Sequence, residues 1–249
     1  MNKSIPVTKT QNNPPTWYLI FIIAYGIWVL APFLTPVFMR LGWDSAAKVI
    51  YSIYSFFCHQ LPERSYFFFG PKTSYSLSEI QTVWENTANP MILRKFIGTP
   101  EMGWKVAWSD RMISFYGGTW LSALIWYPLR NRTKSLHPLW TGVFLTPIAV
   151  DGFTHMVSDF AGIGLGFRDS NLWLANLTNF AYAQSFYAGD ALGSFNSWMR
   201  IITGLIAGVG IIWFAFPFMH QAYSAQSSAP LGKSNKSASK TISERKPYV

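Results

Sequence analysis

Charged residues are scarce in this chain of 249 residues, since Asp, Glu, Lys and Arg together make up only 12% of it. A typical soluble domain carries about twice that share. Cysteine is nearly absent, and the single Cys58 excludes an internal disulfide or a zinc site of paired cysteines. Half of the residues are hydrophobic and 18% are aromatic. These proportions argue against a soluble enzyme, a disordered chain and a disulfide-stapled secreted module, and they predict a membrane protein embedded in a lipid bilayer.

The net charge of +9 raises the question of nucleic-acid binding. Five of the twenty cations lie in the last seventeen residues, and the others are scattered beside apolar segments. No basic helix or aromatic and basic RNA-binding motif occurs. We therefore expect no nucleic-acid partner and attribute the excess of cations to orientation in the membrane.

Four segments are predicted to cross the membrane: 17–39, 104–129, 138–162 and 198–219. The first contains 23 uncharged residues, enough to cross a hydrocarbon core of about 30 Å. Pro32 and Pro36 are expected to kink it. The predicted fold class is an all-α integral membrane protein, a bundle of about four transmembrane helices. The apolar stretch 46–57 predicts an additional interfacial or re-entrant helix, and a fifth span over 44–69 is an alternative that would bury Glu63 and Arg64.

Four spans place both termini on one side, and the cations indicate which side that is. The two terminal segments and the short turn after the second span hold ten cations and one acid: Lys3, Lys9, Arg130, Arg132, Lys134, Lys233, Lys236, Lys240, Arg245, Lys246 and Glu244. The positive-inside rule predicts a multi-pass protein of the cell membrane with both termini in the cytoplasm. Segment 1–16 is then cytoplasmic, 17–220 is the transmembrane domain with outer segments 40–103 and 163–197, and 221–249 is a disordered basic cytoplasmic tail.

Ionisable residues interrupt the predicted spans. Asp151, His155 and Asp159 recur at i, i+4 and i+8, which places them on one face of a helix. Asp110 and Arg111 lie near the outer end of the second span, and Arg200 lies near the outer start of the fourth. Such residues cost roughly 3 kcal/mol each inside a bilayer and normally mark function.

In this topology the charged residues converge on the outer side, where the loop contributes Cys58, His59 and Arg64. We therefore predict an outward polar pocket with Asp151 at its floor. The alternative is structural: Arg111 or Arg200 pairs with Asp151 or Asp159 and holds the helices in register.

Three functional hypotheses remain open. The leading one is a binding or accessory subunit of a membrane complex, in which Arg64, Arg111 and Arg200 hold an anionic headgroup or a partner's carboxylate. The second is a metal-dependent intramembrane enzyme acting on a lipid-like substrate, with a divalent ion on Asp151, His155 and Asp159. The third is a proton or cation pathway through those same residues. No motif of an established catalytic class occurs.

The stretch Cys-His-Gln-Leu-Pro-Glu-Arg-Ser at 58–65 resembles the signature of a family of bacterial multi-pass membrane proteins, domain of unknown function 2085. The segment 109–116, with Arg111 and Tyr116, is similar to its Cys-x-Arg-Cys-Thr-Gly-x-Tyr element, but Ser109 and Met112 replace both cysteines. Segment 151–155 is similar to Asp-Gly-x-Thr-Gln with His155 in place of Gln, and 196–204 carries Arg200 within a third element. The resemblance implies the topology and adds Tyr116 to the site, and it implies no activity.

Overall fold

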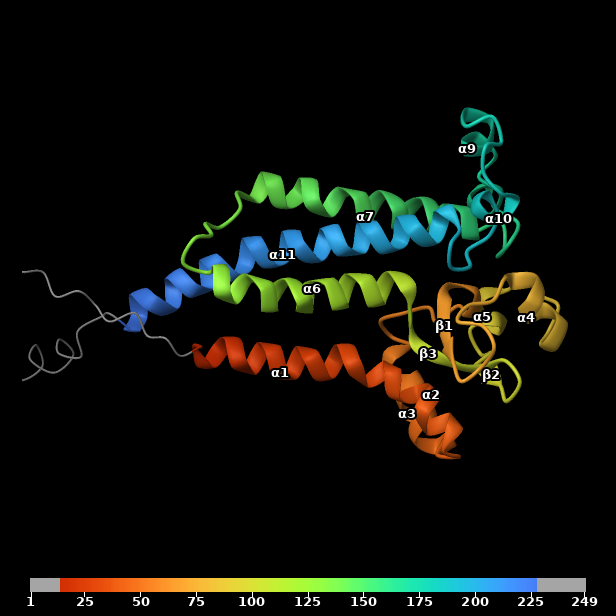
Figure 1. The fold of residues 1–249 in the computed structure, drawn as a ribbon, viewed down its shortest axis with the longest axis horizontal. Coiled ribbons are helices and arrows are strands. Elements are labelled where there is room, and N and C mark those ends of the chain that lie inside the picture. The colour runs from red at the N-terminus through yellow and green to blue at the C-terminus, as the bar shows by residue number, and fades with distance from the viewer. Residues whose placement is uncertain (1–13, 228–249) are drawn as a thin grey trace, which may run out of the picture.

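Four long helices lie side by side in the computed structural model, which describes residues 14–227 (Figure 1). They are α1 (Thr16–Leu30), α6 (Asp110–Leu129), α7 (Pro138–Asp159) and α11 (Phe195–Ser227). Helix α11 packs against both α6 and α7, and α1 packs against α6. Helix α1 begins, and α11 ends, at the end of the bundle opposite the sheet.

The remaining elements gather at the other end of the bundle (Figure 1). Between α1 and α6 these are η1 (Ala31–Phe33), α2 (Leu34–Arg40), α3 (Asp44–Tyr54), η2 (Pro62–Arg64), β1 (Ser65–Phe68), α4 (Leu77–Val83), α5 (Pro90–Leu93), β2 (Gly98–Thr99) and β3 (Gly103–Ser109). Between α7 and α11 they are α8 (Phe167–Ser170), α9 (Leu172–Leu177) and α10 (Gln184–Tyr187). We call this end of the molecule the sheet end.

A small antiparallel sheet corrects the prediction of an all-α fold. Its strand order is β1-β3-β2, with Phe68 opposite Trp104 and Thr99 opposite Gly103. The expected second span was therefore wrong at its start, because 104–109 is strand and the helix begins at Asp110. Strand β3 is buried along most of its length, so its apolar side chains pack inside the protein.

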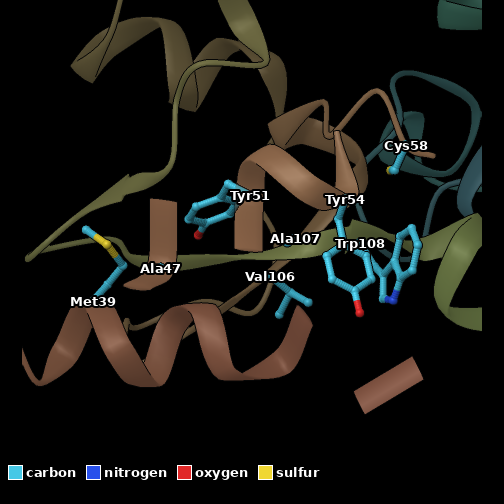
Figure 2. Packing of buried hydrophobic residues seen from close by; sticks show 8 residues of the cluster. All are labelled: Met39, Ala47, Tyr51, Tyr54, Cys58, Val106, Ala107 and Trp108. Carbon is cyan, nitrogen blue, oxygen red and sulfur yellow. The ribbon is translucent and has the colours of Figure 1, made fainter. Parts of the chain in front are cut away.

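The core at the sheet end forms where α2 and α3 pack on β3. Figure 2 shows its buried side chains gathered along this strand: Met39, Ala47, Tyr51, Tyr54, Cys58, Val106, Ala107 and Trp108. The Tyr51 hydroxyl donates to the backbone oxygen of Lys105, and the Tyr54 hydroxyl donates to that of Trp28 at 2.9 Å. These bonds fix α3 against both the strand and the first helix.

Within the described residues, two helices are long and apolar enough to cross a membrane, Thr16–Arg40 and Phe195–Ala225. The first includes α1, η1 and α2, and the 3₁₀ turn interrupts it at Pro32, as the proline positions predicted. Helices α6 and α7 have 20 and 22 residues and coincide with most of the second and third predicted spans. Length and composition identify two candidate spans, and they do not confirm α6 and α7 as the other two.

The predicted extra helix exists as α3, but the alternative of a span over 44–69 is wrong. Helix α3 has 11 residues, about 16 Å at 1.5 Å per residue, and the chain then turns into β1. At the other terminus α11 continues to Ser227, so 221–227 is helical. The remainder of the predicted disordered tail, and most of segment 1–16, lie outside the described residues.

Glycines permit the close approach of α6 and α11. A Cβ atom at Gly204 would lie 2.2 Å from the Ser114 hydroxyl oxygen, and one at Gly208 would lie 2.6 Å from the Thr119 backbone nitrogen. The Gly204-xxx-Gly208 spacing therefore serves close helix packing, and α6 is the neighbouring helix.

The substitution Gly208→Leu should separate α6 from α11, because its side chain would overlap backbone atoms that cannot move aside. Overpacking of this kind costs about 1–3 kcal/mol, which thermal unfolding in a mild detergent would measure as a lower Tm. Gly117→Ala on α6 is the control, since a Cβ atom there meets nothing within 4 Å. Equal unfolding temperatures for the two variants would contradict the packing role of Gly208.

Candidate functional site: a buried network of arginines and aspartates

Four arginines and four aspartates form one buried network at the sheet end of the bundle. The arginines are Arg64, Arg111, Arg168 and Arg200, and the aspartates are Asp110, Asp151, Asp159 and Asp190. They come from η2, α6, α7, α8, α11 and the loop before α11. We call this set the ion-pair network.

Arg200 binds two aspartates from different segments. Its Nε lies 2.8 and 2.9 Å from the two carboxylate oxygens of Asp110, and its Nη1 lies 2.6 Å from Oδ1 of Asp190. Asp110 also accepts a hydrogen bond from Ser197 at 3.2 Å. Because Asp110 is the first residue of α6, its negative charge also interacts favourably with that helix end.

Arg64 continues the network from Asp190 to the end of α7. Its Nε donates to Oδ2 of Asp190 at 2.8 Å, while Nη1 and Nη2 donate to the two oxygens of Asp159 at 2.7 Å each. The Asp159 pair is bidentate, the geometry in which Arg–carboxylate bonds are strongest. Asp190 therefore stands between two guanidinium groups.

Asp151 likewise lies between two guanidinium groups, those of Arg111 and Arg168. Nη2 of Arg111 lies 2.7 Å from Oδ2 of Asp151, and Nη2 of Arg168 lies 2.8 Å from Oδ1. His155 lies between the two halves of the network. Its Nδ1 is 3.0 Å from the Asp151 backbone oxygen, and its Nε2 is 3.5 Å from Oδ1 of Asp190.

The network balances four positive charges with four negative ones. Asp190 and Arg200 are each almost fully buried, which is tolerable only because every charge has a close partner. Burial opposes ionisation of Asp190, but Arg64 and Arg200 hold the pKa of that carboxyl well below its usual value. The sheet end therefore contains a charge-neutral cluster of ionised groups.

A small pocket of about 50 Å³ opens beside this network. Its lining consists of Cys58, His59, Gln60, Leu61, Arg64, Ser109, Arg111, Met112 and Arg200. Three arginines thus face the pocket and no acid lines it. The Cys58 sulfur lies 3.4 Å from the Ser109 hydroxyl oxygen and accepts bonds from the backbone N–H groups of Gln60 and Ser109.

The structure brings together most of the predicted site residues. Cys58, His59, Arg64, Arg111 and Arg200 line the pocket, while Asp110, Asp151, His155 and Asp159 belong to the network around its arginines. Tyr116 lies elsewhere, packed against Trp108 with ring centres 4.9 Å apart and against Trp28. The arginines thus form ion pairs and also line a pocket, but Asp151, which was predicted to form the floor of that pocket, is not among its lining residues.

The metal hypothesis finds no matching ligand set. Among residues 14–227 no group of three His, Cys, Asp or Glu side chains is arranged to hold a metal ion. The Asp159 carboxylate forms an ion pair with Arg64, and the Asp151 carboxylate forms ion pairs with Arg111 and Arg168. These pairs leave the three predicted ligands directed at guanidinium groups.

Sequence reasoning missed Arg168 and Asp190, which occupy the loops between α7 and α11. The sequence feature that could have revealed them is their charge, which is unusual in a segment that is otherwise apolar and aromatic. It also left Glu63 and Lys105 out of the predicted site, and both are buried. Lys105 donates to the backbone oxygens of Gln60 and Arg94 at 2.7 and 3.0 Å, whereas neither carboxylate oxygen of Glu63 has a hydrogen-bond partner in the described chain.

A family described as predicted membrane protein (DUF2085) matches residues 101–214. The predicted resemblance is confirmed. The matched range includes β3, α6, α7 and most of α11, and with them Asp110, Arg111, Asp151 and Arg200. The Cys58–Ser65 motif lies outside that range.

A relative in Methanocaldococcus jannaschii, described as an uncharacterized protein, is 26% identical over 213 residues. The alignment covers 82% of this chain and 94% of the relative. No solved structure matches the chain. The comparisons thus support a membrane protein and assign no activity to it.

The substitution Asp190→Asn should destabilise the protein strongly, because it leaves Arg64 and Arg200 buried without one of their anions. Removing one partner of a buried pair costs about 3–5 kcal/mol, measurable as a loss of unfolding free energy in detergent. Lys72→Gln breaks an exposed pair with Glu79 and should change stability little. A loss no larger than that of Lys72→Gln would show that the network does not hold the sheet end together.

Glu63 should give the protein a characteristic dependence on pH. Burial raises the pKa of its carboxyl to about 7, although the nearby Arg64 acts to lower it. The folded state therefore holds this proton more tightly than the unfolded state. The stability that this proton contributes to the folded state is fully present below about pH 4.5 and is lost as the pH rises towards 7.

The substitution Glu63→Gln should consequently stabilise the protein at pH 8, by up to about 3 kcal/mol for a shift of this size, and have little effect at pH 4.5. Unfolding temperatures measured across this range would show a flatter profile for the variant. Glu101→Gln, at an exposed position, should keep the wild-type profile. Parallel profiles for the wild type and Glu63→Gln would refute the assignment.

Proposed function

We propose that the protein is a binding or accessory subunit of a membrane complex, and that its arginine-lined pocket receives an anionic group. The observation that carries this proposal is the convergence of Arg64, Arg111 and Arg200 on one small pocket without an acidic residue in its lining. These three arginines come from η2, α6 and α11, so the pocket exists only in the folded bundle.

The chemistry of the lining favours a carboxylate or phosphate. Guanidinium groups are planar donors that match such oxyanions in geometry. The Nε–H of Arg111 is buried and has no acceptor among the described residues, which leaves one donor for a ligand. Because one water molecule needs about 10–15 Å³ of such space, a pocket of about 50 Å³ suits a single small oxyanion.

The aspartates behind the pocket would keep its arginines in place before a ligand binds. Each arginine in the lining already donates to a carboxylate at 2.6–2.8 Å. Binding of a ligand would therefore cost little side-chain conformational entropy, which favours selective binding of a correctly shaped anion. The anionic group would come from a partner subunit or from a lipid headgroup.

The two other hypotheses receive less support. The aspartates and His155 are engaged by arginines, as described above, so no metal chemistry is proposed. The buried polar residues of α6 beyond its first turns are Ser114, Thr119 and Ser122, which are not ionisable. A continuous proton or cation path is therefore not proposed either.

Anion binding can be tested with acetate and inorganic phosphate. At constant ionic strength, an anion at ten times its Kd should stabilise the purified wild-type protein by about 1.4 kcal/mol relative to chloride. Arg111→Gln should lose this effect, and Arg132→Gln, in the turn at the opposite end of the bundle, should retain it. The proposal fails if no anion stabilises the wild type, or if Arg111→Gln responds equally.

The source of the anion can then be distinguished. Nanodiscs with phosphatidylglycerol, compared with phosphatidylcholine alone, should stabilise the wild type more than Arg111→Gln if a lipid headgroup occupies the pocket. If a partner carboxylate does so, the two lipids should act equally, and a protein recovered with the wild type from native membranes should be lost with Arg111→Gln.

A further inference from the structure

The chain between α7 and α11 exposes a large apolar surface. We call residues 160–187, which include α8, α9 and α10, the elbow. Eight of its large apolar side chains are exposed: Phe160, Leu165, Phe167, Leu172, Trp173, Leu177, Phe180 and Tyr182. Phe160 is 80% exposed and Leu177 is 76% exposed. Surfaces of this kind are rarely left in water, and they mark contact with a protein or a membrane.

The elbow presents no free charge to its surroundings. Its only charged residues are Arg168 and Asp169. Arg168 is buried against Asp151, and the Asp169 carboxylate accepts the backbone N–H of Gly166 at 2.8 Å. Asn171 is fully buried. The two charged side chains and Asn171 are therefore turned towards the protein, whereas uncharged polar side chains such as Asn176 and Gln184 share the exposed surface with the apolar ones.

Hydrogen bonds hold the elbow in one shape. The Asn171 amide donates to the backbone oxygens of Arg168 and Tyr187 at 2.6 and 2.8 Å. The Asn196 amide, at the start of α11, donates to the backbone oxygens of Arg168 and Gly189. The outward direction of the apolar side chains is therefore built into the fold.

The elbow lies where the bundle helices end. In Figure 1, α9 extends to the side of the bundle, beyond the end of α7 and away from α6 and α1. Helix α7 has 22 residues, about 33 Å at 1.5 Å per residue, which matches a hydrocarbon core of about 30 Å. The candidate span of α11 begins at Phe195, directly after the elbow region. A bilayer crossed by α11 from Phe195 onward would therefore have its boundary at the level of this side branch.

We propose that the elbow is an interfacial membrane anchor, which inserts its exposed aromatic and aliphatic side chains into the headgroup region of the bilayer. Its apolar surface continues from that of α7, where Val150, Phe153 and Val157 are exposed immediately before Phe160. Aromatic residues are enriched at this depth in membrane proteins. A lipid occupant is favoured over a protein partner because the surface is continuous with helix faces that would meet lipid.

Site-directed spin labelling tests this proposal directly, since the only native cysteine, Cys58, is buried. Labels would be placed by Leu177→Cys and Leu165→Cys in the full chain, reconstituted in vesicles of phosphatidylcholine and phosphatidylglycerol. Ile27→Cys, exposed on α1, provides a lipid reference, and Thr82→Cys, exposed on α4, provides an aqueous one. The labelled wild type gives the background.

The measured quantity is the ratio of accessibility to oxygen, which concentrates in lipid, to that of a water-soluble nickel complex. We expect the ratio at positions 177 and 165 to lie well above that at 82 and to approach that at 27. A ratio equal to that at 82 would place the elbow in water. Low accessibility to both reagents would mean that a second protein covers it, and either result would overturn the proposal. Neither result depends on the arginine-lined pocket.

Discussion

The pairing of buried arginines with buried aspartates is the constraint that organises the sheet end. Each of these charges is unfavourable alone in an apolar environment and becomes tolerable only beside its partner. Asp190 satisfies Arg64 and Arg200, and Asp151 satisfies Arg111 and Arg168. Segments that are distant in the sequence must therefore meet at one place. The glycine contact of α6 with α11 brings the helices close enough for this.

Part of this arrangement was predictable because it follows from helical periodicity. The i, i+4 spacing of Asp151, His155 and Asp159 fixed their common face, and the topology correctly placed Asp110, Arg111 and Arg200 near them. Arg168 and Asp190 escaped prediction because irregular loops have no period that fixes the direction of a side chain. The sheet was missed because β1 and β3 pair across about 40 residues, and an aromatic run such as Phe67-Phe68-Phe69 is equally typical of a membrane interface.

The network also links the two proposed contact regions of the molecule. Arg168 lies within the elbow and Asp190 lies just beyond its end, so the elbow is attached to the bundle by the same charges that position the pocket arginines. A membrane-anchored elbow would hold Asp190 at a fixed depth. The pocket would then be presented at a defined height above the bilayer, a useful property for a subunit that meets a partner there.

The position of Arg200 has a consequence for biosynthesis. Asp110 leaves the ribosome long before α11, which supplies Arg200 as its main counter-ion. During that interval the carboxylates of α6 and α7 lack part of their neutralising charge, and burying an unpaired charge is costly. The last helix thus completes the electrostatic assembly, so a chain truncated before α11 would be a substrate for quality-control proteases even though three of the four long helices are present.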